Sequence, residues 1–253
     1  MKYTALVLAG SRPGRDAFAE GFRTDLKALI PVAGEPMVRR PVQALLAAED
    51  IGDVIVLTQA PERIAEILPK DPRVRTRKSG ETIATTMLEI CFDKQTQWPL
   101  LVTTADHALL DVDTIDEFCA YAEGDLSVGV VERETLLKRF PGANRTWLKF
   151  RGGAYTGANL FALNSPKAAA AIELWRSVEQ DRKKGWRLIS LLGPMVLIGT
   201  ALRLLSIQNV LSRVGGKLGL DVTAVVLSNA VAGIDVDKPE DHALAEDILA
   251  GRK

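Results

Sequence analysis

The amino-terminal stretch Leu6–Arg15 reads LVLAGSRPGR, an apolar run followed by a loop that contains glycine and arginine. The run is short and does not alternate with polar residues, which predicts a strand buried on both faces of a sheet. Further short apolar runs alternate along the chain with segments of helical period. This alternation is typical of an α/β fold built on a largely parallel sheet.

The same patterns predict the order of elements. Short apolar runs predict strands at Thr4–Leu8, Val54–Thr58, Leu100–Thr104, Leu126–Val131, Asn159–Ala162 and Thr223–Leu227. Helical periodicity predicts helices at Val38–Ala48, Pro61–Leu68, Thr82–Phe92, Thr114–Tyr121, Lys167–Arg182 and Glu240–Leu249. Residues 132–157, rich in charged, glycine and aromatic residues, favour a long loop or hairpin over a site. Because no internal repeat or linker is present, we expect one domain over residues 1–253, with a helical, apolar insertion at about residues 165–220.

Composition excludes several classes of protein. The 32 Lys and Arg residues balance 32 Asp and Glu residues, so the chain lacks the basic excess that binding to nucleic acid by charge requires. Cys91 and Cys119 are too few for a disulfide framework, which indicates a reducing compartment. The first apolar run is short for a signal peptide, and Arg12–Arg15 follows it in place of a small-residue cleavage site. We therefore expect a cytoplasmic protein.

One long apolar segment, Leu188–Leu202, contains no charged residue. It is shorter than the roughly 18 residues that a membrane-spanning helix needs, and Gly193-Pro194 interrupts it. The basic residues Arg182–Lys184 precede it and raise the alternative of contact with a membrane surface. A buried helix or a subunit face is the favoured interpretation, and the latter leaves a homodimer open.

The loop after the first strand has the composition of a phosphate-binding turn. Gly10 and Gly14 would let the backbone approach a ligand closely, with amide groups exposed as a nest for anions. Arg12, Arg15 and the downstream Lys27 would supply the positive charge that a polyphosphate requires. A charged loop without any ligand is the alternative.

This loop matches neither of the two commonest nucleotide-binding patterns. The P-loop pattern G-x-x-x-x-G-K-[ST] and the dinucleotide pattern G-x-G-x-x-G are both absent. The second predicted strand ends in Thr58-Gln59, where a dinucleotide-binding fold carries an acidic residue. Kinase, ATPase and NAD-dependent activities are therefore disfavoured.

Carboxylates follow two other apolar segments. Asp106 ends the run LLVTTAD, at the carboxyl edge where open α/β sheets bind ligands. The segment GIDVDKPED predicts a short strand, from which Asp235 and Asp237 would project to the same side. Because Mg²⁺ takes one or two protein carboxylates and completes its shell with water and phosphate, Asp106 and one of this pair are candidate ligands.

Simpler interpretations exist for the neighbouring polar residues. Asp106 could cap the following turn, and His107 has no partner at metal-ligand spacing, so a structural role is favoured for it. Glu240 and Asp241 fall in the first turn of a predicted helix, where negative charge is favourable without any ligand.

These motifs together resemble the MobA-like nucleotidyltransferases, a group that includes molybdenum-cofactor guanylyltransferases and sugar- or polyol-phosphate cytidylyltransferases. The family signature reads roughly L-A-G-G-x-G-x-R and then P-K-x-L-x-P-V-x-G-x-P-M, beside which the chain offers Leu8–Arg15 and Leu26–Met37. Asp106 and the segment Asp235–Asp241 follow in the same order, and the resemblance spans nearly the whole chain. Ser11 departs from the signature because it replaces a glycine, and Leu26 and Ala108 stand where relatives have proline.

The resemblance implies a Rossmann-like, three-layer, mixed and mostly parallel sheet with helices on both faces, of the GT-A-like nucleotidyltransferase type. It implies Mg²⁺-dependent transfer of a nucleoside monophosphate from an NTP to a small, phosphorylated acceptor, with release of pyrophosphate. The catalytic residues would be Arg15, Lys27 and Asp106. The nucleotide-binding residues would be Leu8, Ala9, Gly10, Ser11, Arg12, Gly14, Gly80, Glu81, Thr82, Thr85 and Asn159. The metal ligands would be Asp106, Asp235 and Asp237.

Two other functions remain open at the level of sequence. A GT-A-type glycosyltransferase would use a nucleotide sugar, but it would carry an Asp-x-Asp pair at the end of the central strand, where this chain has Asp106-His107-Ala108. A nucleotide-sensing domain would bind the same ligands without turnover. The sequence specifies neither the base of the nucleotide nor the acceptor.

Overall fold

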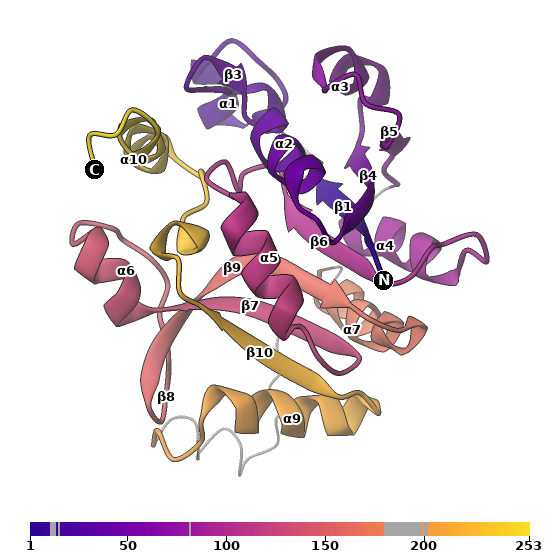
Figure 1. The fold of residues 1–253 in the computed structure, drawn as a ribbon, viewed down its shortest axis with the longest axis vertical. Helices are drawn as coiled ribbons and strands as arrows, with labels where there is room; N and C mark the ends of the chain where they lie inside the picture. Colours follow the sequence, from indigo (N-terminus) through magenta and orange to yellow (C-terminus); the bar gives the residue numbers. More distant parts are fainter. Residues whose placement is uncertain (11–13, 15, 81, 180–198, 200–201) are drawn as a thin grey trace.

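The computed structural model describes residues 1–253 except for 11–13, 15, 81, 180–198 and 200–201. The strands of its main sheet are β1 (Tyr3–Leu8), β4 (Ile51–Thr58), β5 (Val74–Lys78), β6 (Leu100–Thr104), β7 (Leu126–Glu132), β8 (Leu148–Phe150), β9 (Gly153–Leu163) and β10 (Val222–Leu227). Their order is β10-β7-β9-β6-β1-β4-β5, with β8 paired to β9 (Figure 1). A separate two-stranded ribbon is formed by β2 (Pro31–Val32) and β3 (Glu35–Pro36).

Most of the sheet is parallel. β1 runs parallel to β4 and β6, β4 runs parallel to β5, and β10 runs parallel to β7. β9 lies between β6 and β7 and is antiparallel to both. The carboxyl ends of the parallel strands and the beginning of β9 therefore meet at one edge of the sheet.

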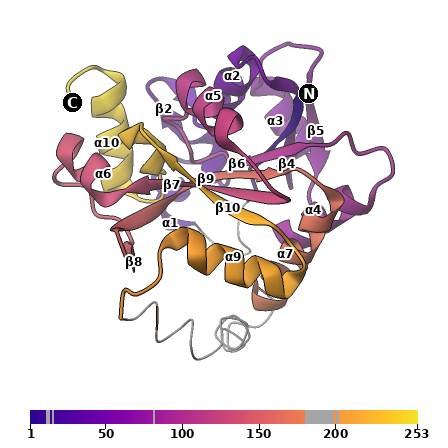
Figure 2. The ribbon, with the colours of Figure 1, turned by 60° about the horizontal axis from the view of Figure 1, so that its bottom comes forward.

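Helices cover both faces of the sheet. The helices are α1 (Ala17–Gly21), α2 (Arg39–Ala47), α3 (Pro61–Ile67), α4 (Ile83–Phe92), α5 (Val112–Tyr121), α6 (Arg133–Arg139), α7 (Ala169–Glu179), α9 (Ile207–Leu218) and α10 (Pro239–Leu249). In Figure 2, α2, α3 and α5 lie above the sheet, and α4, α7 and α9 lie below it. Ala5 and Val7 of β1 belong to the core on the α2 and α5 face, whereas Leu6 belongs to the core on the α4 and α7 face. Neighbouring strand residues point to opposite faces, so both faces of β1 are buried.

The predicted fold class is confirmed: the chain has a three-layer α/β fold with a mixed, mostly parallel sheet. Each predicted strand lies within an observed strand, and each predicted helix overlaps an observed helix. The segment around Asp235 and Asp237, expected to be a short strand, is extended but belongs to no strand. Val236 makes one main-chain hydrogen bond to Asp106 there, with its N donating over 2.9 Å.

Two elements, β5 and α6, were not predicted, because their sequences lack the pattern typical of a strand or a helix. β5 reads VRTRK and has no apolar run, because it is the last strand at one edge of the sheet and its basic side chains reach solvent. In the region 132–157, the hairpin of β8 and β9 is confirmed, but α6 was not expected. Leu136 is the buried residue of this short helix, and one buried position produces no helical period.

The predicted apolar insertion is described only in part. α7 and α9 fall within residues 165–220, whereas the apolar segment 188–202 lies outside the described residues apart from Gly199 and Leu202. In the described part of the chain, no helix combines the length and the apolar character needed to cross a membrane.

The close packing of α9 on β10 predicts opposite effects for two adjacent glycines. A Cβ on Gly215 would lie 2.6 Å from Cγ2 of Val222 and 2.7 Å from the carbonyl oxygen of Leu220, whereas a Cβ on Gly216 would meet nothing within 4 Å. We expect Gly215→Ala to lower the free energy of unfolding by about 1–3 kcal/mol through overpacking. Gly216→Ala should raise it by up to about 1 kcal/mol, because alanine favours the helix. Urea unfolding of both variants measures the difference, and equal shifts would contradict this packing.

Candidate functional site

The carboxyl ends of neighbouring parallel strands bring the predicted nucleotide-binding segments together. The N of Ala9 donates a hydrogen bond to the carbonyl oxygen of Leu57 over 2.8 Å, at the end of β4. The N of Ser79 donates to the carbonyl oxygen of Thr58 over 2.8 Å, at the end of β5. The residues Leu8–Gly10 therefore lie at the same sheet edge as the loop that begins at Ser79.

Gly10 is tightly placed in this edge. A Cβ at Gly10 would lie 3.2 Å from Nε2 of Gln59, so a larger residue would press against the Gln59 side chain. Gly14 has a φ of +114°, a conformation that glycine adopts without strain. The predicted phosphate-binding residues between and after these glycines, Ser11, Arg12 and Arg15, lie outside the described residues.

The loop from Ser79 to Thr86 is closed by its own hydroxyl groups. Thr86 Oγ1 accepts a hydrogen bond from the N of Gly80 over 2.8 Å and donates to the carbonyl oxygen of Thr82 over 3.1 Å. Thr82 caps α4, since its Oγ1 accepts from the N of Thr85 over 3.1 Å. The predicted residues Gly80, Thr82 and Thr85 are thus held in one compact turn, and Glu81 lies outside the described residues.

Lys27 is the point where three distant segments meet. It begins the short 3₁₀ helix Lys27–Leu29, and its Nζ donates to Oδ2 of Asp106 over 2.6 Å and to Oδ1 of Asp237. Burial alone would lower the pKa of Lys27, but the charges and hydrogen bonds of Asp106 and Asp237 raise it above its ordinary value. Lys27 is therefore a cation at neutral pH, suited to bind negative charge.

Asp106 is fixed on both sides. Its Oδ1 accepts a hydrogen bond from the hydroxyl of Thr104, the last residue of β6. Its carbonyl oxygen accepts from the N of Val236 over 2.9 Å, which ties the Asp235–Asp237 segment to the end of β6. The two acidic segments, at Asp106 and at Asp235–Asp237, therefore lie side by side.

Asp235 and Asp237 face different partners. Asp237 contacts Lys27, whereas the Asp235 carboxylate accepts hydrogen bonds from Arg145 and, over 3.3 Å, from Nδ2 of Asn159. Burial raises the pKa of Asp235, and the positive charge of Arg145 opposes that effect. The two carboxylates that share the Lys27 ammonium are therefore Asp106 and Asp237, whereas Asp235 forms an ion pair with Arg145.

Asn159 occupies an irregular position in β9. The pairing of β7 with β9 shifts there, because Val128 pairs with Phe161 but Val130 pairs with Gly157. Asn159 lies in the extra length of β9 and has a φ of +48°, a left-handed conformation that few residues other than glycine adopt. Its side chain reaches Asp235 from this bulge.

His107 is a core residue. It is 1% exposed, and burial lowers its pKa to about 4, so the ring is neutral at neutral pH. The structural role expected for His107 agrees with this burial.

The carboxylates of the site can be compared with what a magnesium ion needs. Among the described residues, no group of three or more His, Cys, Asp or Glu side chains is arranged to hold a metal ion. Asp106 and Asp237 nevertheless converge on one cation, the Lys27 ammonium. Two carboxylates fit Mg²⁺, which prefers one or two and takes its remaining ligands from water and phosphate.

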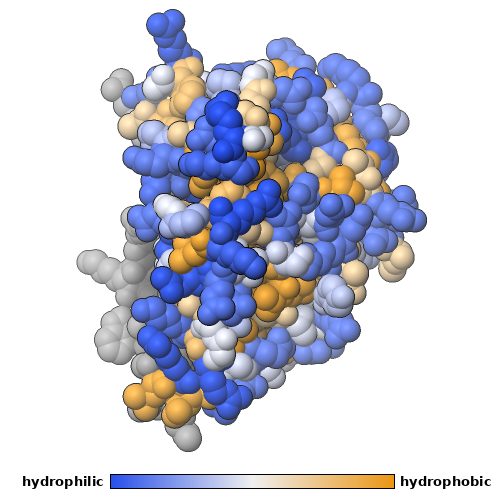
Figure 3. Space-filling model, turned by 60° about the vertical axis from the view of Figure 1, so that its left-hand side comes forward, coloured by the Kyte–Doolittle hydropathy of each residue, from blue (hydrophilic) through white to orange (hydrophobic). Residues whose placement is uncertain are grey.

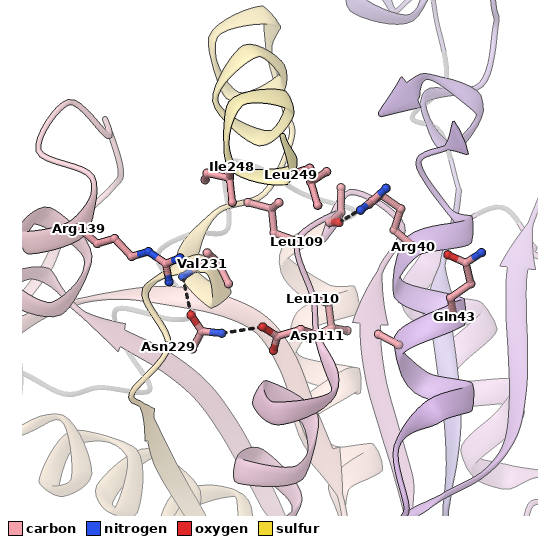
Figure 4. A pocket seen from close by; sticks show the side chains of 12 residues that line it. Arg40, Gln43, Leu109, Leu110, Asp111, Arg139, Asn229, Val231, Ile248 and Leu249 are labelled. Atoms are coloured by element: carbon pink, nitrogen blue, oxygen red, sulfur yellow. Dashed lines mark hydrogen bonds between the residues drawn. The ribbon is translucent and has the colours of Figure 1, made fainter. Parts of the chain in front are cut away.

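The site is distinct from a cavity on the other side of the 106–111 loop. That cavity has a volume of about 340 Å³ and lies between α2, the carboxyl end of α10 and the segment before α5 (Figure 4). Several of its polar side chains bind one another or the backbone: Asp111 accepts from Asn229 over 2.9 Å, and Arg40 donates to the carbonyl oxygen of Ala108 over 3.1 Å. Figure 3 shows the side that carries α6 and α10, where hydrophilic side chains surround small apolar patches.

Comparison with known proteins identifies the family. A family model described as the MobA-like NTP transferase domain matches residues 5–190. The chain belongs to this family. The matched range contains Lys27, Asp106 and Asn159 of the site, and Asp235 and Asp237 follow it. No curated protein sequence matches the chain.

Solved structures include proteins of the same fold. A hypothetical transferase from Thermus thermophilus is 30% identical, with a TM-score of 0.80, over 96% of this chain and 100% of that one. A 4-diphosphocytidyl-2C-methyl-D-erythritol synthase from Anaerococcus prevotii is 13% identical, with a TM-score of 0.61, over 98% and 96%. A nucleotidyl transferase from Methanothermobacter thermautotrophicus is 16% identical, with a TM-score of 0.57, over 100% and 99%. The last two likenesses concern the fold alone.

Sequence patterns did not reveal three residues at the site of this MobA-like protein. Arg145 belongs to the loop after α6, and nothing separates it in sequence from the other charges of residues 132–157. Asp241 was assigned to the favourable charge of a helix terminus, yet it is 5% exposed and binds Arg145. Gln59 was considered in the sequence only because it is not the acidic residue of a dinucleotide-binding fold. In the structure its side chain lies beside Gly10.

The backbone of Asn159 predicts an order of stability for two substitutions. Asn159→Gly and Asn159→Ala both remove the hydrogen bond to Asp235, but only glycine adopts the φ of +48° without strain. We expect the alanine variant to be less stable than the glycine variant by about 0.5–1 kcal/mol in chemical denaturation. An alanine variant as stable as the glycine variant would show that the bulge does not impose this conformation in solution.

Proposed function

We propose that this protein transfers a nucleoside monophosphate from an NTP to a small, phosphorylated acceptor and releases pyrophosphate, in a Mg²⁺-dependent reaction. The observation that carries the proposal is the Lys27 ammonium between Asp106 and Asp237, at the sheet edge that also holds Gly10 and the loop from Ser79. Membership of the MobA-like NTP transferase family supports the same reaction class.

The residues would act mainly by positioning the reactants and neutralising charge. In the transfer, an acceptor oxygen attacks the α-phosphorus, a new P–O bond forms, and the bond from the α-phosphorus to the bridging oxygen breaks as pyrophosphate leaves. Lys27 remains protonated, so it can stabilise negative charge on the phosphates but cannot serve as the base. Arg15 and the Gly10–Gly14 amides are proposed to bind the triphosphate on the basis of the sequence motif.

Asp106 and Asp237 are the carboxylates that we propose hold Mg²⁺, because both already contact one cation, whereas Asp235 is paired with Arg145. When bound, the ion would neutralise charge on the phosphates and orient them for in-line attack. Lys27 occupies the space between the two carboxylates in the free protein, and its flexible side chain would turn toward the phosphates once a metal takes its place.

An acceptor that already carries a phosphate needs no general base, because its oxygen is ionised at neutral pH. The two histidines of the chain are engaged elsewhere: His107 is buried, and Nε2 of His242 lies 2.7 Å from the carbonyl oxygen of Pro31. This supports an ionised acceptor over an alcohol that must lose a proton to the enzyme.

The free thiols support a cytoplasmic location as part of this proposal. Cys91 is buried and Cys119 is half-buried, and neither forms a disulfide. Reduced cysteines agree with a reducing compartment. Membrane contact and a homodimer stay predictions from the sequence.

Pyrophosphate release tests the proposal directly. The purified protein would be mixed with each of the four NTPs, Mg²⁺ and a panel of sugar and polyol phosphates, and pyrophosphate would be followed by a coupled assay. We expect release that needs an NTP, an acceptor and Mg²⁺ together. NTP binding by thermal shift without turnover of any pair would favour the nucleotide sensor, and transfer from a nucleotide sugar would favour the glycosyltransferase.

Substitution of Asp106 tests its role apart from the fold. We expect Asp106→Asn to lower the rate of Mg²⁺-dependent turnover by about 100-fold or more, since it removes charge from the proposed metal pair. Stability should change by less than about 1 kcal/mol, because the side chain is partly exposed. Asp53→Asn is the matched control, because Asp53 forms an ion pair with Arg75 away from the site. Turnover of Asp106→Asn at the rate of the control would remove Asp106 from the mechanism.

A further inference from the structure

Arg145 is a buried cation that contacts the segment preceding Asp237. Its side chain is 8% exposed, although the residue lies in the loop between α6 and β8. One arm of its guanidinium contacts the Asp235 carboxylate, and the other donates to the Asp235 carbonyl oxygen over 3.1 Å and to Oδ1 of Asp241 over 3.0 Å. A long side chain is buried at this depth when it is paired and hydrogen-bonded.

Asp241 continues this network toward the site. Its side chain is 7% exposed, and its Oδ2 accepts a hydrogen bond from the N of Asp237 over 3.4 Å. Arg145 thus contacts the backbone of Asp235 directly and that of Asp237 through Asp241. If the Asp241 carboxylate only stabilised the amino terminus of α10, it would need neither the contact with Arg145 nor that with the N of Asp237.

The Asp237 side chain depends on such support. It is 59% exposed and belongs to no helix or strand, yet it must meet Lys27 and lie beside Asp106. The hydrogen bonds from Val236 to Asp106 and from Asp237 to Asp241 hold its backbone at this place. An exposed carboxylate on an irregular segment is held in one position only if its backbone is anchored.

We propose that Arg145 is a positioning residue, which acts through Asp235 and Asp241 to place the Asp237 carboxylate beside Asp106 and Lys27. This inference rests on the proposed function for its catalytic consequence, but the anchoring of residues 234–238 does not depend on it. The planar guanidinium suits the role, since it contacts two carboxylates and a carbonyl oxygen in different directions. A lysine carries the same charge but cannot reproduce that fork.

Arg145→Gln is the principal variant, and Arg63→Gln is its control. Arg63 also pairs with a carboxylate through both arms, at 2.9 and 2.8 Å from Asp25, but on the exposed surface. We expect the Mg²⁺ concentration for half-maximal pyrophosphate release to rise at least about 10-fold in Arg145→Gln, as when outer-sphere partners of metal ligands are lost. Arg145→Lys should recover part of this shift, and Arg63→Gln should match the wild type.

Hydrogen exchange gives a measurement that does not need activity. In the ligand-free protein, we expect Arg145→Gln to speed exchange of the amides in residues 234–241 at least about 10-fold, with no change in the β1 and β6 amides. A merely destabilised protein would exchange faster throughout. If Arg145→Gln does not fold, Asp241→Ala is the second variant, because it breaks the contacts with both Arg145 and the Asp237 backbone.

The double variant tests whether the two residues act together. If Arg145 acts through Asp241, the shift in Mg²⁺ dependence of the double variant Arg145→Gln with Asp241→Ala should be smaller than the sum of the two single shifts. Additive shifts, or wild-type exchange of residues 234–241 in the single variants, would overturn the proposal. A wild-type protein that releases no pyrophosphate would instead refute the proposed function, and the exchange experiment would still decide the role of Arg145.

Discussion

The site depends on one ammonium group shared by two carboxylates. Lys27 lies near the amino terminus, Asp106 follows β6, and Asp237 precedes α10, so no local sequence preference brings them together. The Lys27 ammonium, whose side chain is 20% exposed, would be unfavourable in this place without a carboxylate beside it. The parallel direction of β1 and β6 carries the first two to one edge, and the hydrogen bond from Val236 to Asp106 carries the third. The arrangement is therefore a property of the whole sheet.

The acidic groups at this edge pair with two different cations. Asp106 and Asp237 contact Lys27, whereas Asp235 and Asp241 contact the buried Arg145. Burial raises the pKa of Asp235, and Arg145 opposes this rise. The sequence does not distinguish these carboxylates, because all four lie in equally acidic segments, but the structure gives each pair its own cation.

The strands of the central sheet and the candidate residues within motifs could be predicted from apolar periodicity and from the order of the motifs. β1, β4 and β6 are apolar runs buried on both faces, so their existence and parallel direction could be predicted. Lys27 and Asp106 could be named as candidates because each lies in a motif at a strand or loop boundary. Arg145 was not found, because its role depends on Asp235 and Asp241, which lie 90 and 96 residues away. α9 falls in the predicted helical insertion, but its bounds were not predicted, because the glycines in its interior disfavour a helix in sequence.

The reversed direction of β9 affects how the protein could vary. Its first residues pair with the last residues of β7, so the connection between them opens on the same edge as the loops after β1, β4, β5 and β6. That connection holds α6, the Arg145 loop and β8, and its ends are fixed by the pairing of β7 with β9. Insertions or deletions within it would change this side of the candidate site, and the pairing of β8, and leave the register of the other strands unchanged. Changes confined to the connection between β7 and β9 are therefore a route by which relatives could come to bind different acceptors.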